Sequence, residues 1–435
     1  MAQFRAAAGF DDYESLHRWS VAEPEAFWAQ VWETAGMIGE RGAQVFVRGQ
    51  SIVDARFFPE ARLNAAENLL ARSGDDEAVV ALDEDGGRRA LTWDQLRGEV
   101  GACSRAMTEL GVGPGDRVAA LLPNGLEAVV TMLSASSIGA VFSSTSPDFG
   151  AAGVIDRFAQ ISPTVLVTTD GYRYGGRRYD TRERVAEVAA ALPSVRQVVR
   201  TGEDWDRFLA PYRGSEPAFE RRAFDHPWYV LFSSGTTGVP KCIVHRSGGV
   251  LIQHRKEHLL HCDVRAGDRV LYFTTTGWMM WNWLASVLAG GATAVLYDGS
   301  PMHPGPEALV DIAESERLTL LGVSARYLSA LRKSGCRPTA THRLDALRTI
   351  CSTGSPLGVD EFEFVYADVK SDVHLASISG GTDLCSCFVL GDPTGAVHGG
   401  EIQCPGLARD GGGRGGRYRV VAERTTGRAG RAGVR

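Results

Sequence analysis

Short runs of apolar and β-branched residues alternate with longer amphipathic segments along most of the chain after residue 75. The short runs are typical of buried strands, and the longer segments have the apolar spacing of helices. Strands alternating with helices predict an α/β fold with largely parallel sheets, in two layered subdomains joined near residues 211–227. The predicted strands are residues 117–122, 140–143, 164–168, 229–232, 242–246, 269–273, 292–297, 318–323, 347–351 and 373–378, and the predicted helices include 126–138, 249–260 and 279–289.

Residues 10–70 have a different pattern, which predicts a mainly helical segment. Its large aromatic residues, Trp19, Phe27, Trp28 and Trp32, are spaced as anchors for packing rather than as a cluster of reactive groups. We therefore expect a packing appendage to the α/β body, without a catalytic role of its own.

Composition limits the classes of protein to which the chain can belong. Its 435 residues are enough for two or more domains or subdomains, and 44% hydrophobic with 23% charged residues is ordinary for a soluble globular protein. The formal net charge of −6 gives no general attraction to nucleic acid or to an anionic membrane, so neither is expected as a partner. We interpret the acidity as a contribution to solubility.

The cysteines and the apolar segments predict a cytoplasmic protein. None of the eight cysteines forms a C-x-x-C pair, so zinc sites and dithiol redox sites are not expected, and the thiols are expected to be reduced. The first twenty residues contain no apolar core of a secretion signal. The longest apolar stretch, 283–297, is interrupted by Gly290 and Gly291 and is too short to span a bilayer.

The strand predicted at 229–232 leads into a loop of small and hydroxylated residues that ends in Pro240 and Lys241. Glycines let the backbone approach a ligand closely, hydroxyl and backbone N–H groups surround oxyanions, and a lysine supplies charge. The alternative, a plain turn between strands, rarely combines all these features. The pattern differs from the Walker loop, because Lys241 follows proline and precedes Cys242. The residues predicted to hold phosphate are Ser233, Ser234, Gly235, Thr236, Thr237, Gly238 and Lys241.

This loop resembles the phosphate-binding loop of the adenylate-forming superfamily, which comprises acyl-CoA synthetases, luciferases and peptide-synthetase adenylation domains. The resemblance implies that the loop holds the β- and γ-phosphates of ATP while a carboxylate attacks the α-phosphate. It also implies the layered α/β architecture of the large N-terminal domain of that superfamily. Three further stretches test the resemblance at independent points.

The first two stretches follow predicted strands. Residues 274–283 (TTTGWMMWNW) occupy the position that lines the acyl pocket in the superfamily, with Trp278 as the candidate wall; the alternative is an ordinary aromatic core. Residues 352–357 (STGSPL) resemble the adenine-binding loop, so Gly354, Ser355 and Pro356 are the candidate adenine contacts. Taken alone, that second stretch would be interpreted as a turn between a strand and a helix.

The third stretch, residues 377–383 (SISGGTD), resembles the motif of the superfamily that ends in Thr-Glu. The resemblance implies that Thr382 binds the α-phosphate and that the following acid helps to hold Mg²⁺, which neutralises phosphate charge. Here Asp383 stands in place of the glutamate and is one methylene shorter. With Lys241, these two residues form the candidate catalytic set.

The same motif bears on the substrate. Acetyl-CoA synthetases have a tryptophan at the position that matches Gly380, so the glycine is expected to enlarge the acyl site beside Gly381 and Trp278. Over residues 10–406 the resemblance is closest to the acetoacetyl-CoA synthetases, whose N-terminal extension the first 70 residues also resemble. This implies activation of acetoacetate by ATP and Mg²⁺ as acetoacetyl-AMP, and its transfer to coenzyme A as co-substrate. The alternatives are a ligase for another short-chain acid and an inactive ATP- or AMP-binding fragment.

We expect three regions, namely a helical extension at 10–70, an AMP-binding domain at 75–407 and a disordered tail at 408–435. The tail has eight Arg, eight Gly and no Leu, Ile, Phe or Trp, which fits a shifted reading frame better than an Arg/Gly nucleic-acid tail. The small C-terminal domain of the superfamily carries a catalytic lysine. The lysines here are at 241, 256, 333 and 370, so that domain is expected to be missing and turnover to be weak.

Overall fold

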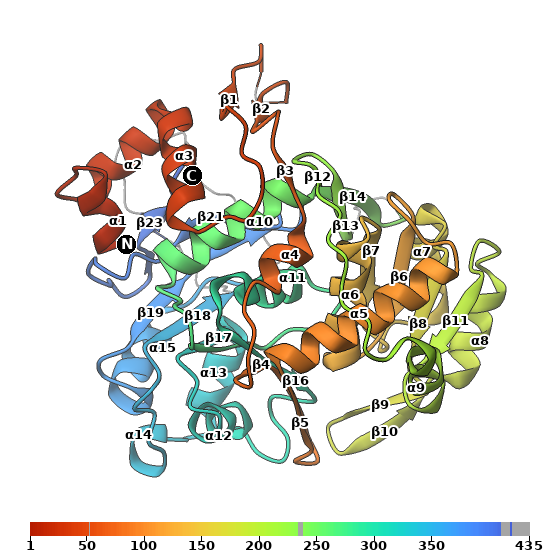
Figure 1. Cartoon of the computed structure of the whole chain (residues 1–435). Helices are drawn as coiled ribbons and strands as arrows, with labels where there is room; N and C mark the ends of the chain where they lie inside the picture. The colour runs from red at the N-terminus through yellow and green to blue at the C-terminus, as the bar shows by residue number, and fades with distance from the viewer. Residues whose placement is uncertain (52, 234–237, 410–417, 420–435) are drawn as a thin grey trace.

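Two sheets form the body of the protein (Figure 1). The computed structural model describes residues 1–51, 53–233, 238–409 and 418–419. Within these residues the chain builds a six-stranded sheet and a seven-stranded sheet, called here the first and the second sheet. The α/β class with largely parallel sheets, predicted from the alternation of strands and helices, is confirmed.

The first sheet has the order β11-β8-β6-β7-β13-β14 and is parallel except for β14, which pairs antiparallel with β13. Both faces of its central strand are buried. Val118 and Ala120 of β6 pack with α5 and α6, whereas Ala119 and Leu121 pack with α7 and α8. The elements are β6 (Arg117–Leu121), β7 (Val141–Thr145), β8 (Val165–Thr168), β11 (Gln197–Arg200), β13 (Pro227–Ser233), β14 (Lys241–Arg246), α5 (Trp93–Glu109), α6 (Leu126–Ser137), α7 (Ala151–Ile161), α8 (Arg182–Ala190) and α9 (Glu203–Leu209).

The second sheet has the order β19-β18-β17-β15-β16-β4-β5 and is parallel except for β5. Its outer face is covered by α12, α13 and α15, which bury Leu271 and Val295, while Val270 and Ala294 face the main core. The elements are β4 (Glu77–Asp83), β5 (Arg88–Thr92), β15 (Arg269–Tyr272), β16 (Thr293–Asp298), β17 (Leu320–Ser324), β18 (Thr349–Thr353), β19 (His374–Ser377), α12 (Ala308–Ser315), α13 (Ala325–Lys333), α14 (Pro338–Thr341) and α15 (Val359–Phe364).

The predicted junction between the subdomains near residues 211–227 is wrong. Strands β13 and β14 lie after it yet complete the first sheet, and β4 and β5 lie before it yet belong to the second sheet. The reason is that sheet membership depends on long-range pairing, here β13 with β7 and β16 with β4. Periodicity along the chain locates strands but carries no information on their partners.

The first 70 residues are helical in part. Helices α1 (Ala2–Ala7), α2 (Tyr13–Ala22), α3 (Pro24–Thr34) and α4 (Ala65–Leu69) are joined by the short strands β1 (Phe46–Val47), β2 (Arg56–Phe57) and β3 (Arg62–Leu63). Phe27 and Trp32 are buried in the main core, as expected of a packing appendage. The appendage also contacts the other end of the body, where the Ala408 N–H donates to Ser20 Oγ at 2.8 Å.

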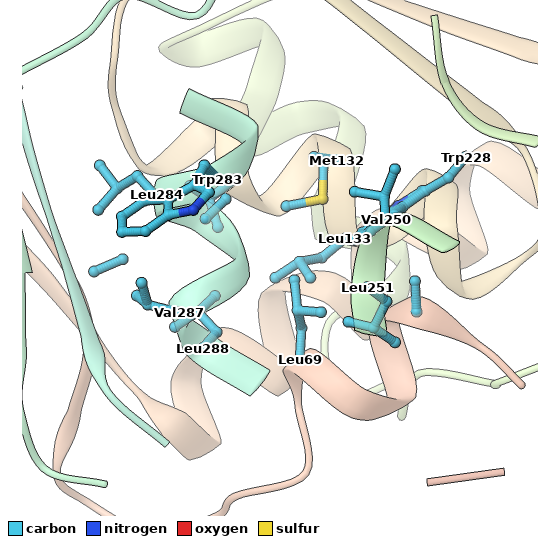
Figure 2. Packing of buried hydrophobic residues seen from close by; sticks show 14 of the residues in the cluster. Leu69, Met132, Leu133, Trp228, Val250, Leu251, Trp283, Leu284, Val287 and Leu288 are labelled. Atoms are coloured by element: carbon cyan, nitrogen blue, oxygen red, sulfur yellow. The ribbon is translucent and has the colours of Figure 1, made fainter. Parts of the chain in front are cut away.

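A helical layer separates the two sheets and holds the largest apolar cluster. Figure 2 shows Leu69 of α4, Met132 and Leu133 of α6, and Val250 and Leu251 of α10 (Ser247–Lys256) around one core. Helix α11 (Met279–Ala285) and the 3-10 turn η3 (Ser286–Gly290) add further apolar residues to it (Figure 2). Because α10 follows β14 directly, this layer is continuous with the hairpin of β13 and β14.

The apolar stretch at 283–297 is divided among α11, η3 and β16. Among the described residues, no helix is both long and apolar enough to cross a membrane. The smaller elements are β9 (Gly171–Tyr174), β10 (Arg177–Asp180), η1 (Ala210–Tyr212), β12 (Arg222–Ala223), the π-helical turns η2 (Glu257–His261) and η4 (Val365–Val369), β20 (Ser379–Gly381), β21 (Ser386–Leu390), β22 (Glu401–Ile402), β23 (Cys404–Pro405) and β24 (Tyr418–Arg419).

Replacing Gly322 by alanine is expected to destabilise the second sheet. Gly322 pairs with Tyr272 of β15, and a Cβ atom at 322 would lie 2.1 Å from Cδ2 of the fully buried Tyr272 ring. The backbone and side-chain shifts needed to accommodate the added methyl group should lower the free energy of unfolding by about 1–3 kcal/mol, measured by urea denaturation. The matched control is Gly98→Ala in α5, where a Cβ meets nothing within 4 Å; it should be neutral or stabilising by up to about 1 kcal/mol. Equal effects at the two positions would contradict the packing argument.

Candidate functional site

The predicted site stretches begin where parallel strands end. Strand β13 ends at Ser233, β18 at Thr353 and β19 at Ser377, and each of the three predicted loops follows directly. In α/β proteins, ligands bind at the carboxyl ends of parallel strands because the loops there converge on a crevice. The strand ends of both sheets therefore set the location of the candidate site.

The loop predicted to hold phosphate connects the antiparallel strands β13 and β14. Ser233 at the end of β13 lies opposite Lys241 at the start of β14 in the register of the hairpin, so both ends of the loop are held at one place. Gly238 has φ +127°, a conformation that favours glycine. Lys241 is exposed to solvent. The predicted phosphate contacts Ser234, Gly235, Thr236 and Thr237 lie outside the described residues.

One hollow of about 350 Å³ brings three separately predicted stretches together. Trp278, the loop at 354–356 and the segment at 380–382 all line it, although they lie far apart in the sequence. Lys241 and Asp383 are not among its lining residues. The lining residues are Trp278, Met279, Met280, Thr353, Gly354, Ser355, Pro356, Ser377, Ile378, Ser379, Gly380, Gly381, Thr382, Ser386, Cys387 and Ile402.

The loop after β18 is an exposed turn that is held at its base. Gly354 has φ +87°, which a residue with a side chain adopts only with strain. The Thr353 hydroxyl donates to the Ile378 carbonyl at 2.8 Å, which ties the end of β18 to the segment after β19. Gly354, Ser355 and Pro356 are themselves exposed, so their backbone groups are open to a ligand in the hollow.

The segment before Trp278 crosses from the second sheet to the first. It follows β15 of the second sheet, yet the Thr276 hydroxyl donates to the Leu122 carbonyl at 2.7 Å and the Ser144 hydroxyl donates to the Thr276 carbonyl at 2.7 Å. Trp278 is half-buried and packs edge-on against Tyr272, with ring centroids 6.2 Å apart. The two sheets are thus tied together at one wall of the hollow.

Gly380 lines the hollow and packs closely against the neighbouring strand. A Cβ atom at 380 would lie 2.1 Å from the Ser386 carbonyl oxygen and 2.7 Å from the Cys387 Cα, both in the backbone of β21. A side chain here would therefore collide with the neighbouring strand and would not fill the hollow. The expectation that a missing indole at this position opens the acyl space stays a prediction, and on this backbone the glycine permits β20 to approach β21.

Asp383 faces a second hollow, of about 490 Å³, beside His245 of β14. Burial lowers the pKa of His245, and the Thr382 backbone and the Asp383 carboxylate oppose this shift. Thr382 and Asp383 thus diverge, with the threonine on the first hollow and the aspartate on the second. The end of the motif is held against β14, the strand that carries Lys241.

Several lining residues were not predicted from the sequence. Ser377, Ile378 and Ser379 lie within the predicted stretch 377–383, although no individual role was predicted for them. Ser386 and Cys387 come from β21, and nothing in their sequence context indicates that this strand folds back beside β20. The buried polar side of helix α10 was also missed, because its charged residues are typical of an exposed helix face.

Comparisons with known proteins agree on one family. The model of the AMP-binding enzyme family matches residues 66–406, and that of the acetyl-coenzyme A synthetase N-terminus matches residues 13–69. An acetoacetyl-coenzyme A synthetase of Rhizobium meliloti (strain 1021) is 51% identical over 416 residues, covering 93% of this chain and 64% of that relative. An acetoacetyl-CoA synthetase of Mus musculus is 42% identical, covering 94% of this chain and 65% of the relative.

A solved structure is similar in fold as well as in sequence. The acetoacetyl-CoA synthetase from Streptomyces lividans matches with a TM-score of 0.89 and 43% identity, over 93% of this chain and 66% of that one. The chain thus spans less than two thirds of the length of each of these relatives.

Proposed function

We propose, from the premise that the chain belongs to the family of AMP-binding enzymes, that it carries the nucleotide and acyl sites of an ATP-dependent acid–thiol ligase. The acid is acetoacetate, which is activated as acetoacetyl-AMP and transferred to coenzyme A. The names of the relatives support this substrate. Because the chain spans less than two thirds of those relatives, the complete activity is proposed and is not assigned to these residues alone.

The observation that carries the proposal is the convergence of three stretches on one hollow of about 350 Å³. A pocket of this size at strand ends, lined by apolar and hydroxylated side chains together, suits a small organic acid beside a nucleotide. Met279 and Met280 supply apolar wall, while Ser377 and Thr382 supply hydroxyls. The hollow therefore combines a place for an acyl chain with hydrogen-bonding groups for a phosphate ester.

The proposed roles follow the position of each residue. The loop from Ser233 to Lys241, including Gly238, holds the triphosphate, and the turn at 354–356 holds adenine. Thr382 contacts the α-phosphate, and Trp278, Gly380 and Gly381 border the acyl group. A carboxylate oxygen of acetoacetate attacks the α-phosphorus and pyrophosphate leaves. The thiolate of coenzyme A then attacks the carbonyl carbon and AMP leaves. The protein acts by orienting these groups and by balancing their charge.

Magnesium is proposed as the cation that enters with ATP and neutralises phosphate charge. Among the described residues, no group of three His, Cys, Asp or Glu side chains is arranged to hold a metal ion. One nearby carboxylate suits Mg²⁺, which binds through one or two carboxylates together with nucleotide phosphates and water. Asp383 is the carboxylate proposed for this role; it is exposed next to Thr382 in the chain, and its side chain lines the second hollow.

The proposal extends to the context of the chain. The AMP-binding domain is assigned to residues 75–407 and the helical extension to 10–70. The tail at 408–435 is assigned as a separate segment, of which 410–417 and 420–435 lie outside the described residues. The protein acts in the cytoplasm on small molecules, without nucleic acid or membrane as a partner.

Binding and carboxylate selection test the proposed function. We expect the 435-residue chain to bind ATP in the presence of Mg²⁺, measured by titration calorimetry. Pyrophosphate release in a panel of acids, with coenzyme A present, should rank acetoacetate and malonamate above acetate and butyrate, because malonamate keeps the 3-oxo group and replaces the methyl by an amino group. Failure to bind ATP contradicts the proposal. ATP binding with preference for a different acid corrects the substrate alone.

A further inference from the structure

We propose that Glu257, which directly follows helix α10 as the first residue of η2, is a positioning residue that couples the helix after the proposed phosphate loop to the turn that carries Thr382. Glu257 lines neither hollow, and it is completely buried. Its carboxylate joins three segments that the proposed function uses separately: α10, β21 and α11. The inference rests on the proposed function, because it assigns Glu257 the task of holding the candidate α-phosphate contact in place.

Four donors converge on the Glu257 carboxylate. Oε1 accepts from the Ser386 hydroxyl at 2.6 Å, from the Cys387 backbone N–H at 3.1 Å and from Gln253 Nε2 at 3.0 Å. Oε2 accepts from the Trp283 indole N–H at 2.9 Å. Ser386 and Cys387 begin β21, immediately after the turn of residues 382–385, so the carboxylate holds the far end of that turn.

The same helix also contacts the last residue of the turn. His254 Nε2 lies 2.6 Å from the Cys385 carbonyl oxygen, one turn of the helix before Glu257. The neighbouring Lys256 donates from Nζ to the Leu407 carbonyl at 2.9 Å and adds favourable charge beside Glu257. The polar side of α10 thus contacts the turn at 385, 386 and 387, while Val250 and Leu251 of the same helix lie in the apolar core (Figure 2).

The fourth donor extends the connection to the acyl wall. Trp283 lies in α11, whose first residues Met279 and Met280 line the hollow that Trp278 borders. The Trp283 ring is fully buried in the core between the sheets (Figure 2), so its N–H has no access to water. A buried carboxylate is costly to hold without partners, and four donors compensate for that cost. Such a group fixes the geometry of all the segments that donate to it.

Glu257→Gln tests the inference because all the partners are donors. An amide can accept on one atom only and would place its own N–H groups against donors, leaving at least one buried donor unpaired. We expect the dissociation constant for ATP·Mg²⁺ to rise about tenfold, since the turn bearing Thr382 shifts. The dissociation constant for adenosine should be unchanged, because the turn at 354–356 is attached to β18 and not to α10. Both are measured by titration calorimetry, well below the unfolding temperature of each variant.

Glu316→Gln is the matched control. Glu316 is also a buried carboxylate, 8% exposed, but it pairs with Arg88 and Arg269 outside the lining of both hollows. The Glu316→Gln substitution should lower the free energy of unfolding to a similar extent and leave the dissociation constants for ATP·Mg²⁺ and adenosine unchanged. If Glu257→Gln does not fold, Gln253→Met keeps the carboxylate and removes the amide that donates both to Glu257 Oε1 and to Ser386 Oγ, and it should show the same selective loss at about threefold.

The outcomes separate this inference from the proposed function. The inference is overturned if Glu257→Gln binds ATP with the affinity of the parent chain. It is also overturned if the variant loses ATP and adenosine binding in the same proportion, because that result marks a merely structural role. A parent chain that binds no ATP contradicts the proposed function, and the inference falls with it. Selective loss of ATP affinity, with the Glu316→Gln control unaffected, supports it.

Discussion

The Lys241→Ala chain should bind ATP·Mg²⁺ ten- to a hundredfold more weakly than the parent chain. Lys241 starts β14 directly opposite Ser233, and it is exposed, so its ammonium group is available to an anion held between the two ends of the loop. A hydrogen bond between charged groups contributes about 1.5–3 kcal/mol, which corresponds to roughly ten- to a hundredfold in a dissociation constant. Titration calorimetry with ATP and with adenosine measures the effect, which should be confined to ATP.

The control for this prediction is Lys333→Ala. Lys333 is the last residue of helix α13, on the outer side of the second sheet. Its replacement by alanine removes the same charge from the protein as Lys241→Ala does. A general electrostatic effect would weaken ATP binding equally in both variants, and that result would contradict the phosphate role of Lys241. A salt titration adds a second check, because the contribution of an exposed lysine should fall as ionic strength rises.

The fold was predicted from the sequence to the extent that local pattern determines it. The apolar run at 117–122 is β6 (Arg117–Leu121), and the helix predicted at 126–138 is α6 (Leu126–Ser137), because period and length are properties of the segment itself. The assignment of strands to sheets could not be predicted. Pairing of β4 with β16 joins residues more than 200 positions apart, and nothing in either run specifies the partner.

In the candidate site, too, local features could be predicted from the sequence and features that depend on distant backbone could not. The segments at 354–356 and 380–382 could be placed on one site because each follows a parallel strand and resembles a known motif, and the structure brings them to one hollow. The direction of a Cβ atom at Gly380 could not be predicted, since it depends on the backbone of β21 a few residues later. Asp383 was expected beside Thr382 in one site, whereas the two residues face different hollows. The direction of each side chain depends on the folded backbone, which the sequence motif does not specify.

The polar side of α10 was the largest omission, and its physical reason is general. The sequence QHRKEHLLH has the charge density of an exposed helix face, and in isolation a solvated helix is the natural interpretation. Burial of Lys256 and Glu257 requires partners, and these come from β21, α11 and the segment at 407. Only the assembled fold shows that these partners are present.

Three histidines of this region should make the protein sensitive to acid. His254, His258 and His261 are fully buried, and burial is the main cause that lowers their pKa, to about 4 for His254 and to about 3 for His261. The unfolded chain has the ordinary value near 6.5, so below that pH it binds protons that the folded chain does not. The free energy of unfolding should therefore be unaffected above about pH 7 and fall as pH decreases, by up to about 1.4 kcal/mol per pH unit for each histidine.

The variant that isolates this effect is His258→Leu. Among the described residues neither ring nitrogen of His258 makes a hydrogen bond of normal geometry, and the ring packs edge-on against Trp283 with centroids 4.2 Å apart. An apolar side chain of similar volume removes the desolvation cost of two polar atoms, so at pH 7 the variant should be about 1–3 kcal/mol more stable. Between pH 6 and 4.5 the free energy of unfolding should fall less steeply with decreasing pH in the variant than in the parent. The difference between the two slopes should be about 1.4 kcal/mol per pH unit.

Urea denaturation at each pH measures both quantities, and His226→Leu, at a half-buried histidine outside α10 and η2, is the control. Parallel pH profiles for His258→Leu and the parent would contradict the assignment, because the His258 ring would then take up protons equally in the folded and unfolded states.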